Sequence, residues 1–126
     1  MPRKLTLKGW IIKLEHLQRD KILKEYNYVC SVNGCTARAN QVDHLFSRNH
    51  KALFFYPDNL NPICAGHNTQ KGFGQGSVAA ELFFKTRNRI GNKRWNQMIG
   101  LLRKPFPHFR KKWYLETVEK QLLTQP

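Results

Sequence analysis

The chain has 126 residues, enough for one domain with a modest hydrophobic core but too few for two large domains. Its 22 lysines and arginines outnumber its 8 aspartates and glutamates, and the net charge of +14 favours a polyanionic partner. Nucleic acid is the leading candidate, although ribosomal and membrane-surface proteins carry similar charge. The sequence lacks an apolar leader and any apolar run of the roughly 18 residues that span a membrane, so we expect no membrane partner and a cytoplasmic location.

The first predicted element is an amphipathic helix from about Thr6 to Tyr26, where apolar residues recur with helical spacing. We interpret its apolar stripe as a core-packing face. The following segment, Cys30 to Asn40, is rich in turn residues. Asn33 and Gly34 both tolerate positive φ, so a tight turn there would bring the cysteines on either side together.

Two short strands are expected next, separated by a long loop. The first has strand character around Val42, within Ala39 to Leu45, and the second runs from Leu60 to Ile63. The irregular loop between them contains an apolar patch, Leu53 to Tyr56, which we expect to pack on the core. A helix should then begin near His67 or Asn68.

The remaining sequence predicts three further helices. A hinge at Gly72 to Gly76 precedes a helix capped by Ser77, and Gly91 ends that helix near Arg89. A second helix capped by Asn92 continues through Leu102. The last helix should span about Arg110 to Leu123.

The C-terminal half is strongly basic. From Lys71 to Lys112 there are eleven lysines and arginines against one acid, Glu81. Ordinary surfaces intersperse both signs of charge, so we expect this region to contact backbone phosphates in a salt-dependent way. The expected DNA-binding residues are Arg48, Lys71, Lys85, Arg87, Arg89, Lys93 and Arg94.

The three cysteines favour a shared metal site. An odd, clustered set in a reducing compartment is better explained by metal ligation than by disulfides. Cys64 and His67 are separated by two residues, and Cys30 and Cys35 by four, so the two pairs could form a closed, structural Cys3His zinc site. The alternative is three buried free thiols.

Between these pairs lies a second chemical motif. Asp43 directly precedes His44 on the first predicted strand, where adjacent side chains point to opposite faces. One could therefore hold a cation while the other faces a substrate. Asn59 and Asn68 follow, and the role of His50, as a loop residue, a phosphate contact or a substitute ligand, stays open.

This pattern of Asp43-His44, Asn59 and Cys64-x-x-His67-Asn68 resembles the HNH (ββα-metal) endonucleases. The resemblance implies that Asp43 and Asn68 bind catalytic Mg²⁺ or Mn²⁺. It also implies that His44 is the general base and that Asn59 organises the loop. The implied fold is α+β and mainly helical: an N-terminal helix (1–28), a zinc-stapled ββα-metal core (29–75) and a basic helical tail (76–126), forming one domain.

Arg89-Ile90-Gly91 and Trp95 in the tail make the chain similar to the NinG (Rap) family of phage recombination endonucleases. That resemblance implies cleavage of branched DNA, such as Holliday junctions or D-loops, in the host cell cytoplasm. An enzyme that places two cuts would be a homodimer. A generic phage or restriction HNH nuclease, or a non-catalytic zinc module that binds DNA, remain the alternatives.

Overall fold

The computed structural model describes residues 6–72 and 76–124, which are mainly helical and contain one small antiparallel sheet. None of the described helices is both long and apolar enough to cross a membrane. In chain order the elements are α1 (Leu7–Glu25), β1 (Gln41–His44), the 3-10 turns η1 (Lys51–Leu53) and η2 (Pro57–Asn59), β2 (Leu60–Ile63), α2 (Ala65–Gly72), α3 (Gly76–Leu102) and α4 (Lys112–Thr124).

Helix α1 forms where the apolar spacing predicts it. The Thr6 hydroxyl oxygen accepts a hydrogen bond from the Gly9 N–H at 2.9 Å, which caps the first turn. The helix ends before Asn27 and Tyr28, whose φ angles of 53° and 59° reverse the chain. The segment therefore turns directly into the loop that carries the first two cysteines.

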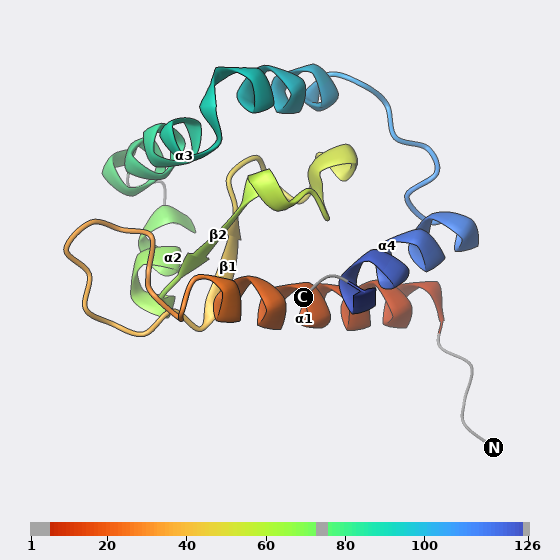
Figure 1. Cartoon of the computed structure of the whole chain (residues 1–126), viewed down its shortest axis with the longest axis horizontal. Coiled ribbons are helices and arrows are strands. Elements are labelled where there is room, and N and C mark those ends of the chain that lie inside the picture. Colours follow the sequence, from red (N-terminus) through yellow and green to blue (C-terminus); the bar gives the residue numbers. More distant parts are fainter. Residues whose placement is uncertain (1–5, 73–75, 125–126) are drawn as a thin grey trace.

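The sheet lies between α1 and α3 (Figure 1). Strands β1 and β2 pair with Gln41 opposite Ile63 and His44 opposite Leu60. All four residues of β2 are buried, since helices cover both faces of the strand. The buried polar residue of β2, Asn61, is satisfied by a hydrogen bond that its Nδ2 donates to the Thr86 hydroxyl of α3 at 3.0 Å.

The apolar core is divided into three clusters around this sheet. One packs α1 against α4 through Leu14, Leu115 and their neighbours, with Phe54 and Phe55 inserted from the loop between the strands. A second surrounds Cys30 and Cys64, and a third packs Leu53 under Trp95 and Met98 of α3. The apolar loop patch is thus a core element, as predicted.

Three predicted helix boundaries were wrong. Helix α2 begins at Ala65, before His67, because the Asn68 N–H already bonds the Cys64 carbonyl oxygen at 3.0 Å. Helix α4 begins at Lys112 and not at Arg110, after a turn closed by the Lys111 N–H and the His108 carbonyl. Ser77 does not cap α3, since Gly76 is already helical. Residues 73–75 of the expected hinge lie outside the described residues.

Helix α3 is broken at Gly91, in agreement with the predicted end of one helix and start of another. Gly91 has φ 80° and ψ 169°, a conformation that is essentially restricted to glycine. The break lets the second half of α3 change direction and lie over η1 and η2 (Figure 1).

Substituting Gly91→Ala should lower the free energy of unfolding by about 1–3 kcal/mol, because a Cβ strains this backbone conformation. Gly100→Ala is the matched control on the same helix. It has helical geometry and open space for a methyl group, so it should stabilise the protein by up to about 1 kcal/mol. Urea denaturation measures both variants; equal effects would contradict a strained break at Gly91.

Candidate metal and hydrolytic site

Cys30, Cys35, Cys64 and His67 meet in one cluster that could hold a zinc ion. Their ligand atoms all lie within 4.8 Å of one another. Tetrahedral zinc with Zn–S bonds of about 2.3 Å requires sulfur atoms about 3.8 Å apart. The Cys35 and Cys64 Sγ atoms are 3.8 Å apart, and His67 Nδ1 lies 3.3 Å from Cys64 Sγ and 3.8 Å from Cys30 Sγ. The donor set and its dimensions therefore fit zinc.

Local backbone geometry brings the two halves of this cluster together. Gly34, with φ 75°, forms the tight turn between Cys30 and Cys35, as Asn33-Gly34 predicts. The Ser31 N–H donates to the Pro62 carbonyl oxygen at 2.9 Å, which ties the cysteine loop to β2. Cys64 follows β2 directly and His67 lies in the first turn of α2.

The sulfur atoms also accept backbone hydrogen bonds. The Cys64 N–H lies 3.4 Å from Cys30 Sγ, and the His67 N–H lies 3.5 Å from Cys64 Sγ. Burial raises the pKa of the Cys64 thiol, but the His67 N–H and the neighbouring ligand side chains outweigh burial and bring this pKa down to about 7. Cys64 thus favours the thiolate form that binds metal.

The purified protein should contain one zinc ion per chain, and His67→Ala should lose most of it because three sulfur ligands leave the tetrahedron incomplete. His50→Ala is the matched control, since His50 is exposed and outside the cluster. Elemental analysis after dialysis measures both. A zinc-free wild-type protein, or an unchanged zinc content in His67→Ala, would contradict this assignment.

Asp43 and His44 make separate contacts, as their positions on a strand predict. Asp43 is 5 % exposed, and its Oδ1 accepts a hydrogen bond from Lys71 Nζ at 2.7 Å. Its Oδ2 is the one buried side-chain polar atom that lacks a hydrogen-bond partner within residues 6–72 and 76–124. A buried carboxylate oxygen without a donor is costly unless a cation lies beside it.

His44 packs its ring on Phe54, at 5.3 Å between centroids, and its Nε2 lies 3.0 Å from the Phe54 carbonyl oxygen. A carbonyl oxygen only accepts, so Nε2 carries the proton of this hydrogen bond. Burial lowers the pKa of His44, which favours a neutral ring near pH 7. Nδ1 of that ring then has a free lone pair that can accept a proton.

Asn59 is fully buried and holds the loop between the strands. Its Oδ1 accepts the Phe46 N–H at 2.7 Å, and its Nδ2 donates to the Phe46 carbonyl at 3.0 Å and the Leu53 carbonyl at 3.1 Å. The side chain thereby links the end of β1 to η1. These contacts are those of a loop organiser, and they position Phe54, the partner of His44.

Asn59→Ala should lower the free energy of unfolding by about 2–4 kcal/mol, because the Phe46 N–H and carbonyl would lose their partner and the Leu53 carbonyl would keep only the Tyr56 N–H. Asn96→Ala is the matched control, as Asn96 is exposed on α3, and it should change stability by less than about 0.5 kcal/mol. Urea denaturation tests the pair. Similar stability of the two variants would show that Asn59 does not hold the loop.

Helix α2 lies along β1 and brings two of its polar side chains to that strand. Asn68 Nδ2 donates to Gln41 Oε1 at 2.5 Å, and Lys71 Nζ donates to Asp43 Oδ1 and, at 3.0 Å, to the His44 carbonyl oxygen. Because the Asn68 amide nitrogen is bonded to Gln41, its Oδ1 is the atom left to accept or to ligate. Lys71 is directed at Asp43 and is largely covered.

A pocket of about 580 Å³ joins these residues to helix α1. Asp43, His44 and Asn68 line it together with Arg48, and α1 contributes four side chains that the sequence did not single out: Glu15, His16, Gln18 and Arg19. Arg48 donates to Glu15 Oε1 at 2.8 Å, which joins the loop after β1 to α1.

One sequence signal could have identified this wall of the pocket. Gln18 interrupts the apolar stripe of α1, and the buried side chain donates to the Phe55 carbonyl at 2.9 Å. A polar residue in a core-facing stripe marks the place where a helix meets an irregular loop. His16 and Arg19 lie beside it on the same helix.

Several of the expected DNA-binding residues of α3 make contacts within the chain. Arg94 forms a two-point ion pair with the buried Asp58, and Arg89 donates to the Asp58 carbonyl oxygen at 3.3 Å. Lys85 donates to the Ser31 carbonyl, and Arg87 lies over the Trp95 ring at 5.9 Å. Lys93 is exposed and makes no ion pair or hydrogen bond within the described part of the chain.

Comparison of this chain with protein-family models, with curated proteins and with solved structures found no match.

Proposed function

We propose that the chain is an HNH endonuclease that hydrolyses DNA phosphodiester bonds, with branched recombination intermediates as its substrates. The observation that carries the proposal is the 580 Å³ pocket that gathers Asp43, His44 and Asn68. A buried, unpartnered carboxylate oxygen and an imidazole with a free Nδ1 are the two features that metal-assisted hydrolysis requires.

His44 is the general base in this proposal. The Phe54 carbonyl orients the ring through Nε2, so Nδ1 takes a proton from the attacking water. Asn59 supports this arrangement indirectly, since it holds the loop that carries Phe54. The phosphodiester is attacked by that water and the 3′ oxygen departs on the opposite side of phosphorus.

Asp43 Oδ2 and Asn68 Oδ1 are the atoms that would hold the catalytic cation. A carboxylate and an amide oxygen are hard ligands suited to Mg²⁺ or Mn²⁺, while the thiolates of the other cluster suit zinc. When bound, the cation supplies positive charge at the scissile phosphate and the departing oxygen. Lys71 occupies only Asp43 Oδ1 and leaves Oδ2 for the cation.

The cations around the pocket are suited to phosphate. Arg48 and Arg19 line the pocket itself. The basic helix α3 lies on the other side of the sheet from α1 (Figure 1), so its exposed Lys93 and Arg87 would hold DNA that extends beyond the cleavage site. Zinc in the Cys3His cluster has a structural role here, because all four of its ligands come from the protein.

One observation favours a second candidate, a non-catalytic zinc module that binds DNA. The Asp43 carboxylate is already paired with the Lys71 ammonium, and a paired carboxylate can be purely structural. This alternative predicts DNA binding without cleavage in Mg²⁺ or Mn²⁺.

Cleavage of a labelled four-way junction and of a matched linear duplex, with and without added Mg²⁺ in buffer free of chelator, tests the proposal. His44→Ala should lower the cleavage rate by about 10²- to 10⁴-fold because general base catalysis is lost. Its zinc content and junction affinity should match those of the wild type, which shows that the variant is folded. Cleavage by His44→Ala at the wild-type rate, or no cleavage by the wild type, would contradict the proposal.

A further inference from the structure

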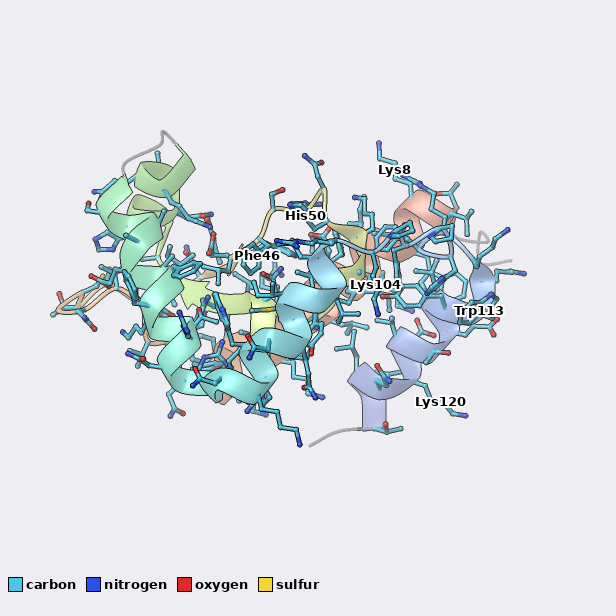
Figure 2. All side chains as sticks on the ribbon, turned by 90° about the horizontal axis from the view of Figure 1, so that it is seen from above. Lys8, Phe46, His50, Lys104, Trp113 and Lys120 are labelled. Atoms are coloured by element: carbon cyan, nitrogen blue, oxygen red, sulfur yellow. The ribbon has the colours of Figure 1, made fainter. Side chains whose placement is uncertain are left out.

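A ladder of aromatic rings lies on the surface between α3 and α4. Phe106 and His108 are 3.8 Å apart between ring centroids, and His108 stacks on Trp113 at 5.1 Å with an interplanar angle of 24°. Trp113 is 58 % exposed and lies at the margin of the molecule in Figure 2. The core packing of α1 against α4 uses Phe109 and Leu115, with Phe106 partly buried against them, and does not include Trp113.

Positive charge surrounds this aromatic ladder (Phe106, His108 and Trp113). The chain has no acid between Arg103 and Leu115. Five exposed side chains in that segment make no ion pair or hydrogen bond to any residue in 6–72 or 76–124: Arg103, Lys104, Arg110, Lys111 and Lys112. Unpaired cations within one short segment repel one another, and an anionic partner stabilises them.

The ladder is connected to the candidate hydrolytic site. A second pocket, of about 190 Å³, lies between the loop 49–52 and the end of α3, and Phe106 and Lys104 line it. Asn49 lines both this pocket and the larger one that contains Asp43 and His44. Figure 2 shows the labelled His50 and Lys104, which line this second pocket, near the middle of the molecule, with Trp113 farther out. Phe106 thus connects the ladder to the second pocket, and Asn49 is shared by the second pocket and the larger one.

We propose that this surface binds an unpaired DNA strand, with bases stacked on Trp113 and phosphates held by Lys111, Lys112 and Lys104. Exposed aromatic rings interleaved with cations are the arrangement that binds single strands without sequence preference. Paired bases in a duplex are stacked on one another and do not offer their faces, so the ladder distinguishes unpaired from paired DNA. Its use in cleavage rests on the proposed nuclease function, whereas strand binding itself does not.

The test is fluorescence anisotropy with a short labelled oligothymidylate, in buffer without added Mg²⁺ or Mn²⁺ and without chelator, so that no cleavage occurs and the zinc of the Cys3His cluster is retained. Trp113→Leu should weaken binding of the single strand by roughly 5- to 150-fold, because the loss of one stacked base removes about 1–3 kcal/mol. Affinity for a duplex of the same length should change less than about two-fold, because the phosphate contacts remain. Trp113→Phe should keep most of the affinity.

Phe84→Leu is the matched control, since Phe84 is 62 % exposed on α3 and contacts Phe83 and not the ladder. It should bind both DNAs as the wild type does. Unchanged single-strand affinity in Trp113→Leu, or an equal loss for single strand and duplex, would overturn the proposal. Because binding is measured without added Mg²⁺ or Mn²⁺, an inactive wild-type protein would refute the nuclease and leave this result interpretable.

Discussion

The arrangement of the central segment depends on the Cys3His cluster. Cys30 and Cys35 come from the loop after α1, and Cys64 and His67 from the junction of β2 and α2, so the cluster joins segments that are far apart in sequence. The apolar core is split among three small clusters, and one of them includes Cys30 and Cys64. A metal held by these four ligands would therefore contribute to folding directly, as expected for a small basic domain.

The position of α2 follows from this cluster and determines what the neighbouring pocket can do. With His67 fixed in the first turn, Asn68 and Lys71 on the same helix meet Gln41 and Asp43 on β1. The residues of the Cys3His cluster and the oxygen atoms that we propose hold a second cation are thus adjacent in the chain but belong to separate sites. Asn59 positions His44, because it holds the loop whose Phe54 carbonyl orients the His44 ring.

Local patterns predicted the helices of α1 and α3, the strand β2, the turn at Gly34 and the four clustered metal ligands, because each depends on short-range spacing or on glycine geometry. The start of α2 was misplaced because Cys64 acts both as a ligand and as the first acceptor of the helix. The α1 wall of the pocket was missed for a different reason: tertiary packing brings Glu15, His16 and Arg19 to β1, and spacing within α1 does not reveal it. Likewise, counting the charges of this region does not reveal that Arg94 pairs with Asp58.

Anomalous X-ray diffraction from crystals grown with manganese tests most directly whether this segment builds two metal sites of different chemistry. Data at the zinc and manganese absorption edges would locate each element separately. We expect zinc among Cys30, Cys35, Cys64 and His67, and manganese beside Asp43 Oδ2 and Asn68 Oδ1. Manganese absent from Asp43 while zinc is present would leave only the structural cluster and would contradict a hydrolytic centre in this pocket.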